Sequence, residues 1–454
     1  MLKLHTLYSR SKRLLTLDLM SMLLLLGIVS SARAQRPLTL DSAVAFANVH
    51  APLLRAATLN VEEAQLAHRE AELAPYPPLK YNVGASYAPS GRNFGYDPAV
   101  TNEGQLNGQL TVQGTIYNGG AYGLRKQQAA LDVTHAEAGL ALTREDLRFD
   151  VTQSFLEDLR DRMDITIEQE SVTELQSYRD LVDRLFHGGT SGYTDLLKTE
   201  VQLGEENIAL EKARADEIQA RFALASLLGI PSDTAFIVEG TFDSVFTVPA
   251  YRMESYDSLV TLTISLAQNE LERARIDIDL ARATAKPEID ANIDAGLLTS
   301  VQNITGPPDQ RNPFWGASAG ISITGPILDW GLNKTQVEEK EVIVQILESQ
   351  LDEQRRELAA QITQLLLLLR TSRDRLADVR ANLQKARDSY DLEKAKYAVG
   401  GALASEVLDA QKQVLDTRLA ELQILSDIES YRANLRHLTA APSPNTNNNA
   451  NNGK

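Results

Sequence analysis

Four short segments of the chain alternate between apolar and polar residues. In the clearest of them, residues 289–297, Ile289, Ala291 and Ile293 are separated by aspartate and asparagine. Alternation with a period of two places one set of side chains on each face of a β-strand. The same pattern predicts strands in three other segments, 80–87, 109–116 and 317–323.

These segments form two predicted strand pairs, 79–117 and 288–324, joined by glycine-, proline- and asparagine-rich loops over 88–107 and 300–313. Each alternating run has roughly 9 residues, near the length that a strand needs to cross a membrane. One face of every run is apolar and uncharged, as in a transmembrane β-barrel with lipid outside and water inside. A soluble, half-buried hairpin has the same pattern, and the strands alone do not exclude it.

Long helices dominate the rest of the chain. Residues 120–186 and 331–397 contain no proline, and each stretch gives about 100 Å of α-helix at a rise of 1.5 Å per residue. In the second stretch and in the helix after it, apolar residues recur every seven positions, which is typical of a coiled-coil seam. The three series are Ile362, Leu369, Leu376, Leu383, Tyr390 and Tyr397; Leu351, Leu358 and Leu365; and Leu408, Leu415 and Leu422.

A glycine-rich turn follows each long helix, and a second long helix follows each turn. The chain therefore contains two predicted antiparallel helical hairpins, with tips near 187–193 and 399–405. A shorter helix precedes each strand pair, over about 40–73 with Asp41 as its cap and over about 256–285. Both shorter helices end at prolines, which cannot continue a helix.

The chain contains this series of elements twice, which indicates an internal duplication. The first repeat is predicted over 35–245 and the second over 246–440, each with a helix, a strand pair and a helical hairpin. Three landmarks align at nearly the same offset: 186–189 match 397–400 at 211 residues, 117–119 match 329–331 at 212, and 78–79 match 287–288 at 209.

Four strands do not close a barrel. A four-stranded sheet leaves two open edges, and hydrocarbon does not tolerate unpaired backbone groups. Eight strands form a small, filled barrel, and a wider bore needs more. Three copies of the chain supply twelve strands. The predicted fold class is therefore mainly α with transmembrane β: a homotrimer with a twelve-stranded barrel in the membrane and a tunnel built from the helical hairpins.

The first 34 residues have the pattern of a cleavable signal peptide. A basic segment precedes an apolar stretch at 19–29, which is too short for a membrane anchor, and Ala32-Arg33-Ala34 is a small-x-small cleavage site. Removal of residues 1–34 takes away five basic residues and one acidic residue, so the formal charge changes from −16 to −20. At the other end, the asparagine-rich segment 441–454 is predicted to be a disordered tail.

The composition excludes several functions. The chain has no cysteine, which excludes disulfides, thiolate metal sites and a lipid anchor attached through cysteine. Its acidic charge argues against a nucleic-acid partner. The sequence contains no catalytic motif and no phosphate loop, and its histidines have no ligand spacing. We therefore expect no enzyme activity, no cofactor and no bound metal.

Three motifs resemble the TolC-like outer-membrane efflux channels: the N-terminal segment 38–57, the strand-to-helix junction 328–331 and the second hairpin tip 397–411. The resemblance extends over essentially all of 35–440. It implies a homotrimer in the lipid of the outer membrane of a Gram-negative bacterium, with the helical tunnel in the periplasm. It also implies two partners, a periplasmic adaptor (membrane fusion protein) and an inner-membrane pump of the RND or ABC type. The channel would passively conduct what the pump delivers.

Two other functions stay open at this stage. An outer-membrane component of type I protein secretion would have the same sequence features, because the pump selects the cargo. A periplasmic adaptor is also exported and contains a helical hairpin. It would have one hairpin beside a small β domain, whereas this chain has two hairpins and two strand pairs.

The resemblance also implies a gate at the hairpin tips. The acidic pair that surrounds the family's constriction matches Glu406 and Asp409, which are three residues apart and share one face of a helix. In a trimer they would form two rings of three carboxylates, which favour cations and repel anions. The alternative is that both are solvated residues that interact favourably with the N-terminal end of the helix dipole.

A polar network that ties the tips shut in the family matches Thr194, Asp195 and Tyr397, whereas its arginine falls at Ala402. We therefore expect Asp195 to pair with Tyr397 in a weaker latch. Glycines in a tight turn permit positive φ, and they also let a partner helix approach closely. The tip residues that match the family's adaptor-contacting region are Gly188, Gly189, Thr190, Gly400 and Gly401.

Overall fold

The computed structural model describes residues 36–87, 104–231, 236–242, 260–300 and 314–442. The predicted signal peptide and nearly all of the predicted disordered tail lie outside these residues. Contacts divide the chain into two compact units, and each unit takes segments from both sequence repeats. Unit 1 contains Met1–Ala51, Asp146–Tyr251 and Gln364–His437, and unit 2 contains Pro52–Glu145, Arg252–Thr363 and Leu438–Lys454.

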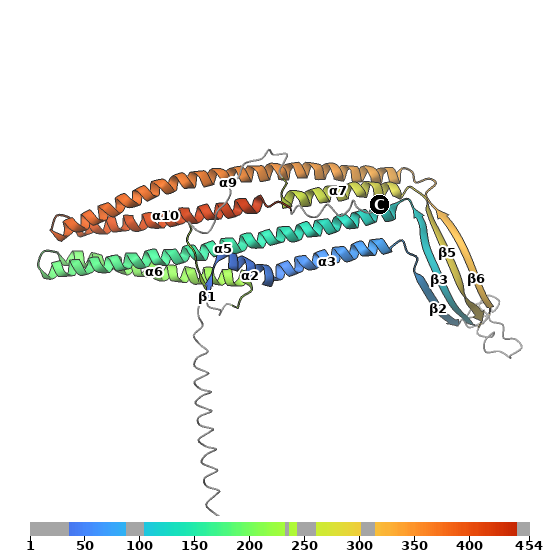
Figure 1. The fold of residues 1–454 in the computed structure, drawn as a ribbon, viewed down its shortest axis with the longest axis horizontal. Helices are drawn as coiled ribbons and strands as arrows, with labels where there is room; N and C mark the ends of the chain where they lie inside the picture. The colour runs from blue at the N-terminus through green and yellow to red at the C-terminus, as the bar shows by residue number, and fades with distance from the viewer. Residues whose placement is uncertain (1–35, 88–103, 232–235, 243–259, 301–313, 443–454) are drawn as a thin grey trace, which may run out of the picture. The chain divides into compact units, whose positions relative to one another are not determined.

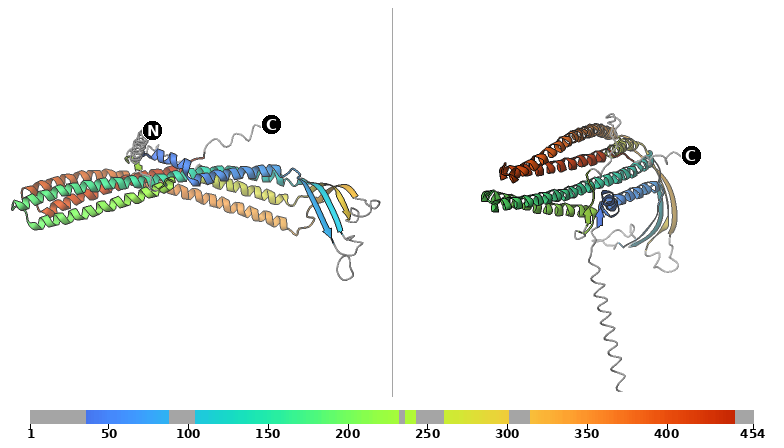
Figure 2. Two further views of the ribbon diagram at one scale, coloured as in Figure 1. Left: turned by 90° about the horizontal axis from the view of Figure 1, so that it is seen from below. Right: turned by 60° about the vertical axis from the view of Figure 1, so that its left-hand side comes forward.

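Unit 2 contains one four-stranded sheet. Its strands lie in the order β2 (Leu79–Tyr87), β3 (Gly104–Asn118), β5 (Glu288–Ser300) and β6 (Phe314–Thr324), and every neighbouring pair is antiparallel (Figure 1). The four strands bend together, as Figure 2 shows. Both predicted strand pairs are therefore confirmed, and β3 and β5 join the two repeats at the centre of the sheet. Strand β3 begins at Gly104, so the loop predicted to extend to residue 107 ends earlier.

The register of the central strands matches the predicted alternation except at one residue. Val112 lies opposite Ile293, and Thr111 lies opposite Asp294. The register shifts between Thr115 and Tyr117, where one extra residue of β3 forms a bulge. The predicted alternation through Ile116 is therefore wrong, because Tyr117 occupies the next paired position.

The two helical hairpins are present. Helix α5 (Ala121–His187) returns as α6 (Tyr193–Leu228), and α9 (Leu332–Ala398) returns as α10 (Ala404–Leu438) (Figure 1). Helices α5 and α9 have 67 residues each, and each contributes its first part to unit 2 and its last part to unit 1. The predicted series of seven-residue spacings is confirmed, because all of its members are buried except the half-buried Leu376.

The strand-to-helix junctions correct the predicted alignment by one residue. The Asn118 side chain accepts a hydrogen bond from the backbone N–H of Tyr122, and Asp329 accepts one from Asn333. These caps align residue 118 with residue 329, so the offset here is 211 and the predicted 212 is wrong. Trp330 (φ 53°) consequently occupies the position of Gly119 (φ 70°). A left-handed backbone is uncommon for a bulky residue.

The shorter helices differ from the prediction at their boundaries. The expected helix over 40–73 consists of α2 (Leu40–His50) and α3 (Pro52–Leu73), because Ala51 precedes a proline and has an extended backbone. The cap of α2 is Thr39, which forms a capping box with Ser42, whereas Asp41 lies in the first turn. Helix α7 (Leu262–Ala283) begins after its cap at Thr261, and the first four residues of the expected helix, 256–259, lie outside the described residues. Strands β1 (Arg36–Leu38) and β4 (Phe236–Val238) pair in parallel in unit 1.

Candidate functional site

One face of the unit 2 sheet is apolar and exposed. Val83, Leu110, Ile293 and Ile321 come from the four strands, and each is more than half exposed in the single chain. Aromatic residues mark both ends of the sheet: Tyr87 and Trp315 are exposed at one end, and Tyr76 and Trp330 are exposed beyond the other. Apolar bands flanked by aromatic residues are typical of membrane strands, whose aromatic side chains lie at the two membrane–water interfaces.

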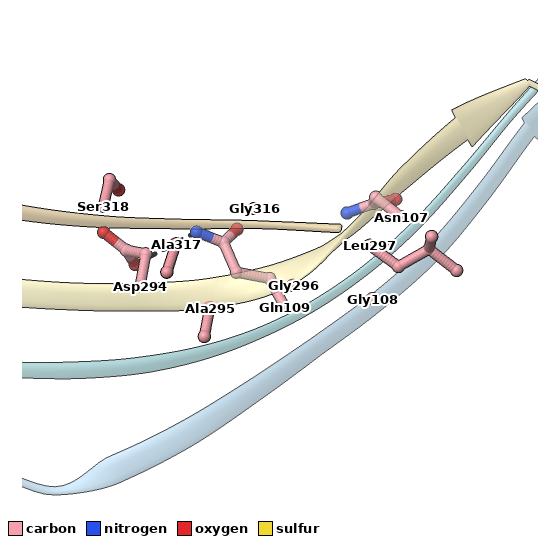
Figure 3. Close-up of a pocket in the computed structure, with 10 residues that line it drawn as sticks. All are labelled: Asn107, Gly108, Gln109, Asp294, Ala295, Gly296, Leu297, Gly316, Ala317 and Ser318. Carbon is pink, nitrogen blue, oxygen red and sulfur yellow. Dashed lines mark hydrogen bonds between the residues drawn. The ribbon is translucent and has the colours of Figure 1, made fainter. Parts of the chain in front are cut away.

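The opposite face of the sheet is polar. Asp294 accepts hydrogen bonds from the Thr111 hydroxyl at 2.6 Å, the Gln109 amide at 3.0 Å and the Asn292 amide at 2.6 Å. Four residues away on the same face of β5, Asp290 accepts a hydrogen bond from the Thr115 hydroxyl at 2.7 Å. In Figure 3, Gln109 and Asp294 point to one side of the sheet and Ala295 points to the other. The sheet thus has one face suited to lipid and one suited to water.

A glycine allows two strands to approach closely on this polar face. A Cβ atom at Gly296 would lie 2.4 Å from the carbonyl oxygen of Gly108, which is closer than real atoms pack. Gly296 and Gly316 face each other across β5 and β6 and line the same hollow as Asp294 (Figure 3). The sequence showed Gly296 only as a small member of the alternating segment 289–297.

The hairpin tips in unit 1 are tight turns built around one left-handed glycine each. Gly189 has φ 74° and Gly400 has φ 78°, and the two are 211 residues apart. Their neighbours Gly188 and Gly401 have no positive φ. Thr190 is exposed, and its hydroxyl donates a hydrogen bond to the carbonyl of Leu185 at 3.0 Å. The turn geometry thus requires glycine at Gly189 and Gly400, but not at the neighbouring Gly188 and Gly401.

The predicted latch residues come together through a serine. The Tyr397 hydroxyl lies 2.7 Å from the Ser191 hydroxyl, and Ser191 donates a hydrogen bond to the Asp195 carboxylate at 3.3 Å. Burial raises the pKa of Tyr397, and the nearby Asp195 carboxylate raises it further. Thr194, the other predicted member, is exposed.

Ser191 is the latch residue that sequence reasoning missed. Its position is equivalent to Ala402 of the second repeat at the offset of 211, the position where the resemblance implies an arginine. The predicted latch thus lacks the arginine in the second tip and gains a hydroxyl in the first. The one available signal was its spacing of four residues from Asp195: Ser191 lies just before α6, and Asp195 lies in the first turn of that helix.

A core of apolar residues from four helices lies behind the latch. Tyr178 is 1% exposed, stacks edge-on against Tyr397 with ring centroids 5.5 Å apart, and donates a hydrogen bond to the Ala404 carbonyl at 3.4 Å. Burial raises the pKa of Tyr178, so its hydroxyl stays protonated. The core residues are Leu175, Tyr178, Val182, Leu196, Leu383, Ala386, Tyr390, Tyr397, Ala404, Val407, Leu408, Ala410 and Val414.

The predicted gate carboxylates lie on the opposite side of α10 from this core. Glu406 and Asp409 are exposed, whereas Val407 and Leu408 between them are buried. Glu406 also accepts a hydrogen bond from the backbone N–H of Leu403 at 2.8 Å, so it caps the start of α10. The geometry of Glu406 is thus compatible with both interpretations, a gate carboxylate and a solvated residue at the start of the helix, because the capping carboxylate stays exposed.

Within the described part of the chain, no helix is both long enough and apolar enough to span a membrane. The same residues contain no group of three or more histidine or acidic side chains arranged to hold a metal ion.

A family model described as outer membrane efflux protein matches residues 46–230 and 262–441, one segment in each repeat. The chain belongs to the outer membrane efflux protein family. This efflux protein is 23% identical over 391 residues to the cation efflux system protein CusC of Escherichia coli K12, covering 84% of the chain and 82% of CusC. It is 24% identical over 408 residues to the cobalt-zinc-cadmium resistance protein CzcC of Cupriavidus metallidurans, covering 88% and 89%.

Solved structures share the fold of the efflux protein. CusC superposes with a TM-score of 0.77 at 19% identity, covering 89% of this chain and 92% of CusC. VceC from Vibrio cholerae superposes with a TM-score of 0.74 at 17% identity, covering 88% and 96%. The predicted family, the mainly helical fold with membrane strands and the function as an outer-membrane efflux channel are confirmed by these matches.

Proposed function

We propose that three copies of this efflux protein assemble into the exit duct of a tripartite complex, with a twelve-stranded barrel in the outer membrane. The open-edged sheet supports this proposal most directly. Strands β2 and β6 are its outer strands, and their outward backbone groups need partners in hydrocarbon. Pairing β6 of one copy with β2 of the next closes the sheet.

Uncovered helix stripes support assembly with further copies. Leu59, Leu66 and Leu73 on α3 are seven residues apart, and each is more than half exposed. Val201 and Ile208 on α6 have the same spacing and are 62% and 72% exposed. A seven-residue apolar stripe is a coiled-coil seam that needs a second helix. In a symmetric trimer the neighbouring copy supplies that helix.

The hairpin tips are the proposed gate and docking site. Glu406 and Asp409 would form two stacked carboxylate rings, and the latch around Tyr397 would hold the rings closed. The exposed turns around Gly189 and Gly400 would contact the periplasmic adaptor, which connects the duct to an inner-membrane pump.

The cargo that fits best is a metal cation. CusC and CzcC carry cation transport and metal resistance in their names, which favours metal efflux over protein secretion for this chain. Carboxylate rings at a constriction attract cations and repel anions. The protein would reach the outer membrane after cleavage of residues 1–34.

Two measurements test this proposal. The purified protein should fractionate with outer membranes as a trimer and give cation-selective conductance in a planar bilayer. Replacing both gate residues, by Glu406→Gln and Asp409→Asn, should reduce the preference for cations without loss of trimers. A soluble monomer would overturn the proposed duct. If a strain that lacks the gene resists cobalt, zinc and cadmium as well as its parent strain does, the proposed metal cargo would be overturned.

A further inference from the structure

The part of α5 in unit 1 carries an acid ladder, defined here as Asp158, Asp161, Asp164 and Glu168. These residues are three or four positions apart, so they follow one side of the helix. Asp158 is 0% exposed and Glu168 is 6% exposed. Acidic side chains are rarely buried to this degree unless a cation pairs with them. Asp161 has such a partner, Arg160 at 2.8 Å, whereas Glu168 lies among polar and acidic groups.

A polar cluster joins Glu168 to two other helices. Its carboxyl lies close enough to the carboxyl of Glu206 on α6 for the two to influence each other's ionisation. Gln411 on α10 donates a hydrogen bond to the Ser171 hydroxyl at 2.6 Å, and Ser171 donates one to Glu206 at 3.4 Å. Gln202 also donates to Glu206, at 3.2 Å. Three helices thus meet at four buried side chains.

The cluster has more buried acceptors than hydrogen-bond donors. Oε2 of Glu168 and Oε1 of Gln411 are buried and accept no hydrogen bond from any residue that the structure describes. Two carboxylates cannot bond to each other unless one is protonated, because an ionised carboxylate only accepts. A single proton shared by Glu168 and Glu206 would supply a donor between the two carboxyls and remove the repulsion between them.

The charges that face Glu168 favour its neutral form. Glu206 from α6, Asp164 from α5 and Asp416 from α10 are all acidic. The neighbouring cation on α10, Arg418, reaches instead to the exposed Glu170 at 2.8 Å. Burial and these carboxylates raise the pKa of Glu168 to about 7.

The cluster lies on the seam between α5 and α10. Contacts along this seam run antiparallel: Tyr178 bonds to Ala404, Ser171 to Gln411, and Gln153 to Ser430. Any movement of α10 away from α5 must break or shift the bond to Gln411. The cluster therefore lies where an opening motion would be resisted.

We propose that Glu168, Glu206, Ser171 and Gln411 form a proton-dependent clasp that holds α10 against the α5–α6 hairpin. One shared proton closes the clasp, and ionisation of both glutamates releases it. The link to channel opening rests on the gate described under the proposed function, whereas the clasp itself is a property of each chain.

The direction of the pH effect follows from proton linkage. The pKa of Glu168 is raised in the closed form. The proton therefore stabilises the closed form fully at pH values below the ordinary glutamate pKa of 4.5, and this stabilisation is lost as the pH rises through about 7. If Glu168 regains its ordinary value of about 4.5 on release, the closed-to-open ratio falls by up to about 10²-fold between pH 5 and pH 8.5.

Spin labels attached to Thr173→Cys on α5 and Gln413→Cys on α10 test the clasp. Both positions are exposed, and the natural chain has no cysteine, so the label attaches only at these two sites. Trimers are assembled with an excess of unlabelled chains, and pulsed electron resonance measures the distance within one subunit. We expect a longer distance to become populated as the pH is raised from 5 to 8.5. Glu168→Gln keeps a neutral hydrogen-bond donor at this position, so in that variant the distance between the two labels should stay short at both pH values.

Matched variants make the result decisive. Glu205→Gln removes an exposed carboxylate beside Glu206 and should keep the full pH response. Glu206→Gln should abolish that response and serves as the second variant if Glu168→Gln does not assemble. A wild-type distance independent of pH, or an unchanged response in both glutamine variants, overturns the clasp. A pH-dependent distance in a protein without channel conductance overturns the proposed function and leaves the clasp standing.

Discussion

Replacement of Ser191 by alanine should favour the open channel. The substitution removes the 2.7 Å contact with the Tyr397 hydroxyl and the 3.3 Å bond to Asp195, and it leaves the phenol of a residue that is only 6% exposed without its partner. A hydrogen bond of this kind stabilises a folded structure by about 1 kcal/mol. Three equivalent latches contribute about 3 kcal/mol, so the ratio of open to closed trimers should rise by roughly 10²-fold if they open together.

Single-channel recording in planar bilayers measures this ratio directly. Tyr397→Phe removes the other hydroxyl of the same contact, so it should raise the open probability by a similar factor. The double variant should open little more often than either single variant. Ser177→Ala is the matched control, because Ser177 is exposed and bonds only locally to Thr173. Equal open probabilities for wild type, Ser191→Ala and Tyr397→Phe in intact trimers would refute the latch.

Three further outcomes are expected. Gly400→Ala should destabilise the second tip by about 1–2 kcal/mol, seen as a lower melting temperature, because φ is 78° there; Gly401→Ala, without a positive φ, should be near neutral. Asp158→Asn should flatten the fall in stability between the ordinary pKa of 3.8 and about pH 7. Burial and the nearby Glu217 raise the pKa of Asp158 to about 7, so stability is lost as pH rises through 7, by at most about 4 kcal/mol. Gly296→Val should reduce the yield of heat-resistant trimers, because its Cβ would collide with the neighbouring strand.

Features with a local periodic signal could be predicted from the sequence. The seven-residue spacing from Ile362 to Tyr397 follows from the geometry of one helix, and burial of that series confirms it. The strand pairs follow in the same way from period-two alternation. The bulge at Ile116 gave no such signal, because the alternation continues through it in the sequence and only the pairing with β5 reveals the extra residue.

Contacts between distant segments were beyond the sequence patterns. Ser191 and Tyr397 are 206 residues apart, and nothing in either segment specifies that their hydroxyls meet. The acid ladder was missed for a related reason. Acidic residues on a helix normally indicate a solvated face, and only the packing of α6 and α10 shows that Asp158 and Glu168 are buried.

The duplication explains why titratable groups are concentrated on one hairpin. At the offset of 211, Asp158 corresponds to Leu369 and Glu168 corresponds to Val379, so at these two positions the second repeat has aliphatic residues where the first has carboxylates. The energy of an aliphatic seam does not depend on pH, whereas a buried carboxylate seam is weakened when it ionises. The attachment of α10 to the α5–α6 hairpin is therefore the contact that protons can control. A change of pH would then separate the two hairpins along the seam that carries Gln411.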